Sequence, residues 1–171
     1  MVGVVLGSDS DLPVMRSAVE ALALFGIACE VEIASAHRVP ERVAEYARTA
    51  EARGLKVIIA GAGGAAHLPG VIAALTPLPV IGVPVAAGTL GGLDALLSIA
   101  QMPKGVPVAT VAVNGAFNAG VLAAQILGAG DPALREKVKV YKEGLGREVA
   151  AKSERLRALG VEGYLKSKGQ A

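Results

Sequence analysis

The chain has 171 residues, a length that fits one α/β domain with a modest tail. Its formal net charge of +2, with 19% charged residues, gives no excess of the kind that draws a protein onto nucleic acid or an anionic membrane. Aromatic residues make up 3% and tryptophan is absent, which removes the stacking platforms that single-stranded nucleic-acid binders use.

Strand and helix patterns alternate along the first 130 residues. β-Branched apolar runs predict the strands, while apolar residues at helical spacing, often opened by proline and closed by glycine, predict the helices. The predicted strands are 2–6, 28–33, 55–60, 80–83 and 106–113. The predicted helices are 14–25, 40–54, 68–75 and 117–127, with a glycine-rich turn at 61–66.

The strands are apolar on both faces, which indicates a parallel sheet covered by helices on either side. Crossovers of this length favour a doubly wound order, so we predict a three-layer αβα sandwich of the flavodoxin-like kind. We expect residues 1–130 to form this single α/β domain. The remainder, 131–171, has an amphipathic helical pattern despite Gly144 and Gly146 and predicts a helical extension that packs on a neighbouring subunit.

Two long segments carry no full charge when His67 is neutral, one between Lys56 and Asp94 and the other between Lys104 and Asp131. Prolines and glycines interrupt both, so neither supplies about 20 continuous apolar helical residues for a membrane span. Burial within the domain and against other subunits is the better interpretation. Cys29 has no intrachain partner and the amino terminus lacks a leader pattern, which favours the cytoplasm.

Polar residues gather in the loops that follow the first three strands, where an open parallel sheet binds its ligands. After the first strand, Ser8 and Asp11 offer groups that suit a phosphate and a ribose hydroxyl, although Asp11 or Ser10 could instead only cap the next helix. After the second strand, Ser35-Ala36-His37-Arg38 places an imidazole beside a guanidinium. A solvent-exposed histidine with an arginine in a surface salt bridge is the alternative.

The glycine-rich loop after the third strand leaves room for a flat ring or a phosphate near Ala62 and Gly63. His67 and Leu68 follow directly, and His67 could equally be a structural histidine. The loop loosely matches a dinucleotide fingerprint, but it lies after the wrong strand and lacks the acidic residue about 20 positions on. Two histidines and one cysteine supply too few ligands for zinc, and no serine nucleophile elbow is present.

These loops together resemble the bacterial-type 5-(carboxyamino)imidazole ribonucleotide mutases, a family of purine biosynthesis. The resemblance rests on three segments in matching order and spacing, and it continues through 79–85, 98–108 and the helix near Asn118. The three segments are Gly7-Ser8-Asp9-Ser10-Asp11, Ser35-Ala36-His37-Arg38 and Gly61-Ala62-Gly63-Gly64-Ala65-Ala66-His67-Leu68-Pro69-Gly70.

The resemblance implies a mutase that moves a carboxyl group within an aminoimidazole nucleotide without cofactor or metal. His37 is then the general acid and base, while Ser8, Asp11 and Arg38 bind the nucleotide. We expect Ser35, Ala62, Gly63, His67 and Leu68 to line the same site. The resemblance also implies a homo-octamer and functional coupling with the ATP-dependent synthetase that makes the carbamate.

The related carboxylases that use free CO2 are the first alternative. They typically carry lysine where this chain has Arg38, so the mutase branch fits better. Leu12, Val39 and Phe117 depart from the pattern of the family without removing a catalytic group. The loop 86–92 is a hypothetical lid over the site.

Two alternatives from other classes are a flavodoxin-like FMN carrier and a noncatalytic nucleotide-binding module. A flavin carrier usually needs aromatic side chains in the loops, and this chain has none there. A binding module would not need an imidazole among phosphate-binding groups.

Overall fold

Five parallel strands form the centre of the structure, a computed structural model that describes residues 1–169. The strands are β1 (Val2–Leu6), β2 (Cys29–Ile33), β3 (Val57–Gly63), β4 (Val80–Val85) and β5 (Ala109–Thr110). They lie in the order β2-β1-β3-β4-β5, so the chain begins inside the sheet and winds outward in both directions. This order, with the helices described next, confirms the predicted flavodoxin-like sandwich.

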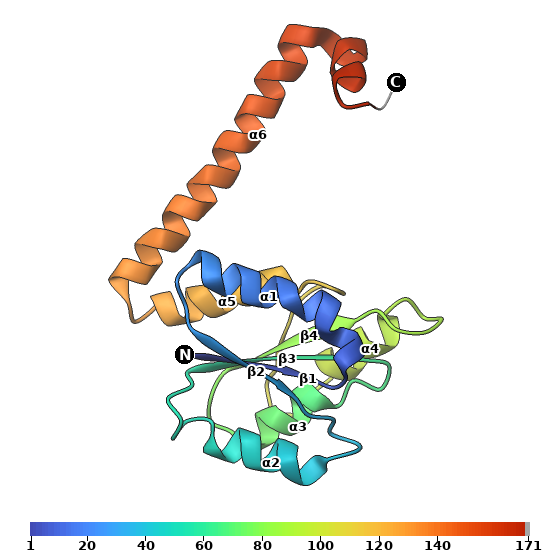
Figure 1. Cartoon of the computed structure of the whole chain (residues 1–171), viewed down its shortest axis with the longest axis vertical. Helices are drawn as coiled ribbons and strands as arrows, with labels where there is room; N and C mark the ends of the chain where they lie inside the picture. Colours follow the sequence, from blue (N-terminus) through green and yellow to red (C-terminus); the bar gives the residue numbers. More distant parts are fainter. Residues whose placement is uncertain (170–171) are drawn as a thin grey trace.

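Helices cover both faces of the sheet (Figure 1). On one face lie α1 (Leu12–Leu24) and α5 (Ala116–Gly128), and on the other lie α2 (Pro40–Thr49), α3 (Leu68–Leu75) and α4 (Leu93–Ala100). A short 3₁₀-helix over Asp9–Asp11 joins β1 to α1. Each strand therefore ends in a loop at the same edge of the sheet, which is where the polar segments of the sequence meet.

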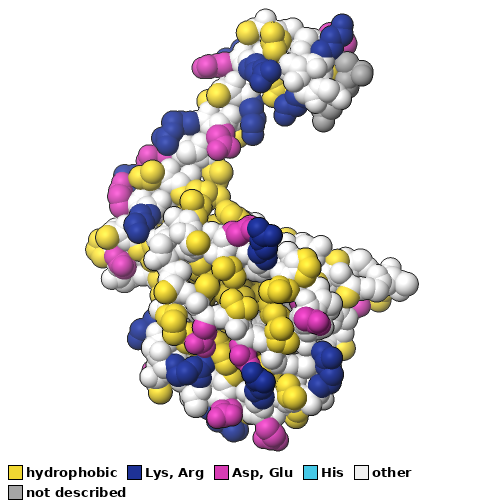
Figure 2. Space-filling model, in the orientation of Figure 1, with side chains coloured by type: hydrophobic (Ala, Val, Ile, Leu, Met, Phe, Trp, Pro, Cys, Tyr) yellow, Lys and Arg dark blue, Asp and Glu magenta, His cyan; other side chains and the backbone are white. Residues whose placement is uncertain are grey.

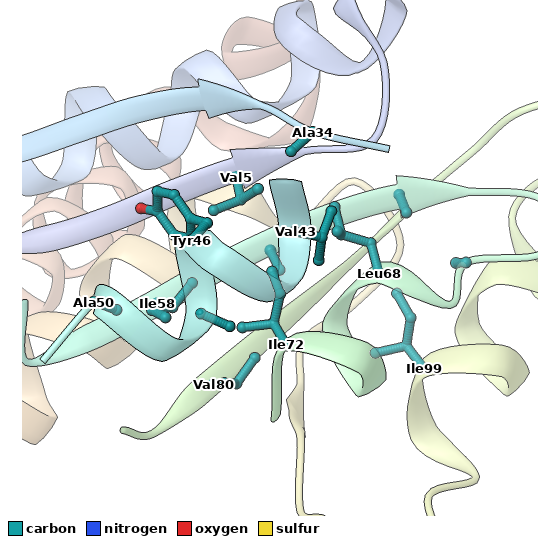
Figure 3. Close-up of a cluster of buried hydrophobic side chains, with 14 of the residues drawn as sticks. Val5, Ala34, Val43, Tyr46, Ala50, Ile58, Leu68, Ile72, Val80 and Ile99 are labelled. Carbon is teal, nitrogen blue, oxygen red and sulfur yellow. The ribbon is translucent and has the colours of Figure 1, made fainter. Parts of the chain in front are cut away.

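The sheet separates two apolar cores because successive side chains of a strand point to opposite faces. Ile58 of β3 packs toward α2 and α3, where Figure 3 shows it in one cluster with Val43, Leu68 and Ile72. Ile59, the next residue, belongs to the core under α1 and α5. Full burial of each such side chain contributes roughly 1.5–3 kcal/mol.

Small residues let α1 and α5 approach closely. A side chain at Gly120 would have its Cβ 2.6 Å from the Cβ of Ala21 and 2.8 Å from the backbone oxygen of Ala18. Real Cβ atoms do not come that close, so the position requires glycine. The alanine-rich composition of α5 is thus explained by packing against α1.

Three elements differ most from the sequence prediction. Strand β5 covers only Ala109–Thr110 instead of 106–113, since Pro107 has no N–H to donate to a ladder and the N–H of Val106 closes a turn to the oxygen of Pro103. Helix α4 was not predicted because its buried residues, Ala95 and Ile99, follow a glycine-rich stretch that hides the periodicity. Strand β3 also continues to Gly63, into the segment predicted as a turn.

The last helix, α6 (Pro132–Ser167), projects from the body as a long arm (Figure 1). The carboxylate of Asp131 caps its start by accepting hydrogen bonds from the N–H groups of Ala133 and Leu134, at 2.9 and 3.1 Å. Only Leu134 and Val138 are buried, against Phe25 and Ala124. Gly144 and Gly146 lie within the helix, and Gly160, with φ 65° and ψ 172°, kinks it.

None of the helices over residues 1–169 is both long enough and apolar enough to cross a membrane.

Candidate active site

A cavity of about 360 Å³ opens at the edge of the sheet where β1, β2 and β3 end. Most of its lining comes from the ends of these strands and the loops after them, because the order β2-β1-β3 makes them neighbours, and Ala87 comes from the loop after β4. The cavity brings together all nine residues that the sequence predicts for the site: Ser8, Asp11, Ser35, His37, Arg38, Ala62, Gly63, His67 and Leu68. Gly7, Ser10, Ala36, Ala65 and Ala87 complete the lining.

The loop after β1 is held by a capping box. The N–H of Ser8 donates to the carboxylate of Asp11 at 3.1 Å, and the hydroxyl of Ser8 accepts from the N–H of Ser10 at 3.3 Å. The carboxylate of Asp11 makes no capping bond to α1, whose start it precedes. The hydroxyl of Ser8 also donates to Asp9 at 3.0 Å and accepts from the hydroxyl of Ser10 at 2.9 Å. Ser8 and Asp11 therefore have a structural role in this loop, and both residues line the cavity.

Asp11 is a buried carboxyl, 6% exposed. Desolvation raises its pKa above the ordinary 3.8, and the neighbouring charge of Asp9 adds to the rise. The hydrogen bond from Ser8 and the positive charge of Arg38 lower the pKa in the opposite direction. A ligand hydroxyl that donates to this carboxylate would replace hydration that burial has removed.

Arg38 ties the loop after β2 to the loop after β1. Its guanidinium donates to the backbone oxygen of Gly7 at 2.9 Å, which uses one of five N–H donors. The side chain is exposed, and its other N–H donors can bind an anion in the cavity. The structure thus does not place Arg38 in a surface salt bridge, which was the alternative interpretation of the sequence.

His37 and His67 are in direct contact. The Nε2 atom of His37 lies 2.8 Å from Nδ1 of His67, and the two rings are nearly perpendicular at 84°. His67 comes immediately before α3, and its own N–H donates to the oxygen of Ala65 at 2.9 Å. His67 is exposed at the cavity, so it is not a core histidine.

Packing, and not ligand access, explains two glycines at the end of β3. A side chain at Gly61 would collide with the sulfur of Met15, and one at Gly63 would have its Cβ 2.8 Å from the Cβ of Ala87 and 3.0 Å from the oxygen of Val85. Gly64 differs, since it has φ +63° and open space around it. Of these three glycines, only Gly64 fits the expectation that a missing side chain leaves room for a ligand.

The loop 86–92 borders the cavity through Ala87. The N–H of Ala86, at the base of the loop, donates to Oδ1 of Asn114 at 2.9 Å. Asn114 has φ 56°, a left-handed conformation that asparagine tolerates better than most residues. Sequence reasoning missed Asn114, and its only signal was the turn-forming pair Asn114-Gly115.

Within residues 1–169, no three histidine, cysteine or acidic side chains come together in a way that could hold a metal ion. Polar groups in the cavity are instead suited to an anion and to hydroxyls, beside an imidazole pair that can carry protons.

The profile of the AIR carboxylase family matches residues 1–148. The chain belongs to this family. An N5-carboxyaminoimidazole ribonucleotide mutase of Thermotoga maritima is 62% identical over 167 residues, which cover 98% of each chain. The chloroplastic phosphoribosylaminoimidazole carboxylase of Vigna aconitifolia is 57% identical and covers 98% of this chain but only 30% of its own length.

Solved structures share the fold. A crystal structure of Treponema denticola PurE has a TM-score of 0.84 at 29% identity, covering 91% of this chain and 97% of that one. The match extends well beyond the sheet, since so large a share of both chains superposes.

Proposed function

We propose that this chain is a 5-(carboxyamino)imidazole ribonucleotide mutase, which converts its substrate to 4-carboxy-5-aminoimidazole ribonucleotide in purine biosynthesis. The observation that carries the proposal is the cavity, where His37 and Arg38 lie together with Ser8 and Asp11. The mutase of Thermotoga maritima is 62% identical to this chain, against 57% for the carboxylase of Vigna aconitifolia, and Arg38 stands where the carboxylases that use free CO2 typically carry lysine. The mutase assignment is therefore preferred to the carboxylase.

In this proposal, the nucleotide is anchored at its phosphate and ribose. Arg38 holds the phosphate with its guanidinium, and the hydroxyl of Ser8 donates to the phosphate in place of its bond to Asp9. Asp11 accepts a hydrogen bond from a ribose hydroxyl. Ser35, Ala62, Gly63, His67 and Leu68 line the space that the rest of the nucleotide occupies.

His37 carries the proton in both halves of the reaction. It donates a proton to the exocyclic nitrogen as the N–C bond of the carbamate breaks and CO2 leaves. The ring carbon then attacks the retained CO2, a C–C bond forms, and His37 removes the proton from that ring carbon. Imidazole suits this exchange because its reference pKa of about 6.5 lies near neutral pH. No cofactor or metal takes part.

The loop 86–92 acts as a lid that keeps CO2 in the cavity. Gly88, Gly91 and Gly92 all have positive φ, and glycine gives these positions access to more backbone conformations than any other residue would. Ala87 already borders the cavity, so a small movement of the loop would narrow the opening.

The active form is a homo-octamer in which the extension 131–171 packs on a neighbouring subunit. Leu90 in the lid and Leu93 and Leu97 in α4 are 61%, 55% and 50% exposed. Figure 2 shows more hydrophobic side chains gathered on the face of the body over α1 and the strands next to it. The exposed large hydrophobic side chains of α1 and β2 include Leu24, Val31 and Ile33. Apolar patches of this kind favour subunit contacts.

The oligomer can be tested by light scattering at micromolar concentration. The expected mass is eight times that of one chain. A monomeric mass would contradict the proposal. We place the enzyme in the cytoplasm, coupled to the ATP-dependent synthetase that supplies the carbamate.

Carboxyl retention tests the mutase directly. The substrate would carry ¹³C in its carboxyl group, and the reaction would run in unlabelled bicarbonate. A mutase keeps the label in the product, whereas an enzyme that uses free CO2 gives unlabelled product. Loss of the label would move the assignment to the carboxylase, and binding without any product would leave only a nucleotide-binding module.

A further inference from the structure

The contact between His37 and His67 constrains where the protons of both rings lie. A hydrogen bond between two ring nitrogens needs one N–H and one lone pair, so only one of the two facing nitrogens is protonated. Two arrangements satisfy this rule. Either Nε2–H of His37 donates to Nδ1 of His67, or Nδ1–H of His67 donates to Nε2 of His37.

Only the first arrangement lets His37 act as an acid and as a base while the bond persists. With Nε2–H donating, Nδ1 of His37 has a free lone pair in the neutral ring and carries a second proton in the charged ring. In the second arrangement, a proton added to His37 would have to go on Nε2, where it would face the N–H of His67. That bond would break each time His37 became charged.

The backbone holds His67 where it can be an acceptor. Its N–H donates to the oxygen of Ala65, its oxygen accepts from the N–H of Val71 at 3.0 Å, and the next residue, Leu68, is buried. The side chain makes no capping bond to α3, so Nδ1 has no competing backbone donor at the start of that helix.

We propose that His67 is a positioning residue whose Nδ1 accepts a hydrogen bond from Nε2–H of His37. This hydrogen bond fixes the tautomer of His37. It makes Nδ1 of His37 the atom that exchanges protons with the substrate. The carboxylate beside the histidine of a serine protease fixes a tautomer in the same way. The inference rests on the proposed function for its catalytic consequence, but not for the tautomer itself.

The tautomer can be measured without any substrate. The chain has only two histidines, so protein labelled with ¹⁵N-histidine gives two imidazole patterns in two-bond ¹H–¹⁵N correlation spectra. His37→Asn and His67→Asn each remove one pattern and so assign the other. We expect His37 in the Nε2–H form with a lone pair on Nδ1, and His67 with a lone pair on Nδ1. A proton on Nδ1 of His67 would overturn the proposal even if the enzyme is a mutase.

Kinetics separates positioning from substrate contact. His67→Leu removes the acceptor and should lower kcat on the order of 100-fold with KM little changed, since general acid–base catalysis is worth at least that much. His67→Asn places an amide oxygen near the position of Nδ1 and should recover roughly tenfold, as one hydrogen bond would. His67→Gln, whose amide lies one bond farther out, should recover less.

A raised KM with unchanged kcat in His67→Leu would make His67 a substrate contact and contradict the proposal. Equal loss in the Asn and Leu variants would contradict it as well. If the wild-type protein has no turnover, the proposed function fails, and the spectra still decide the tautomer.

Discussion

Gly63→Ala tests how the end of β3, the lid and the cavity are packed together. The new Cβ would lie 2.8 Å from the Cβ of Ala87 and 3.0 Å from the oxygen of Val85, whereas ordinary contacts begin at 3.4 Å. The oxygen of Val85 cannot move easily, because β4 pairs with β3 at this register. Ala87 lies on an exposed loop and can move, so we expect the lid to be pushed away from the site.

The cost follows from overpacking, which is typically about 1–3 kcal/mol. For a chain of this size, each kcal/mol lowers Tm by roughly 2–4 °C, so Tm should fall by roughly 2–12 °C. Both proteins would be scanned by calorimetry at one protein concentration, because subunit association shifts Tm. A displaced lid should also lower kcat more than it weakens nucleotide binding.

Gly146→Ala is the matched control for this experiment. Gly146 lies inside α6 with no atom of its own subunit near the position of a Cβ, so alanine should stabilise the helix by roughly 0.5–1 kcal/mol. Its kcat should equal that of the wild type. Unchanged Tm and unchanged kcat in Gly63→Ala would refute the packing argument for the lid.

Two further predictions concern the anchoring groups. Arg38→Ala should weaken nucleotide binding roughly 10- to 100-fold by titration calorimetry, and Arg38→Lys should recover part of the affinity. Arg16→Ala, which removes an exposed arginine paired with Glu20, should leave the affinity unchanged. Unchanged affinity in Arg38→Ala would show that Arg38 does not bind the nucleotide. Because burial raises the pKa of Asp11 above 3.8, the free energy of unfolding contributed by this group decreases as pH rises from 3.8 through the folded-state pKa. Asp11→Asn should therefore unfold at higher denaturant concentration than the wild type at neutral pH and lose this advantage below about pH 3.8, while nucleotide binding weakens. No stability difference at neutral pH would show that the carboxylate is not destabilised by burial.

The sandwich was predictable because its signals are local. Apolar strands such as 2–6 and 55–60, with proline and glycine at helix ends, are repeated along the chain, and parallel strands then bring their loops to one edge. The meeting of nine predicted residues in one cavity follows from that topology. Their roles in binding and catalysis remain predictions.

Contacts between distant segments were beyond the sequence. Nothing in the residues around His37 and His67 indicates that Nε2 and Nδ1 lie 2.8 Å apart, since the distance depends on how two loops are oriented. The hydrogen bond from Ala86 to Asn114 joins segments 28 positions apart in the same manner. The packing of Met15 over Gly61 is also nonlocal, so the glycine looked like an opening for a ligand.

The central claim is that His37 carries the proton for the carboxyl transfer, and His37→Asn tests it most directly. Nucleotide binding would be measured by calorimetry and turnover by conversion of the carboxyamino substrate, with wild-type protein alongside. The account predicts nearly wild-type affinity with kcat reduced on the order of 100-fold or more, because asparagine keeps a polar side chain but does not exchange protons as imidazole does. Near-normal turnover in this variant would contradict the account.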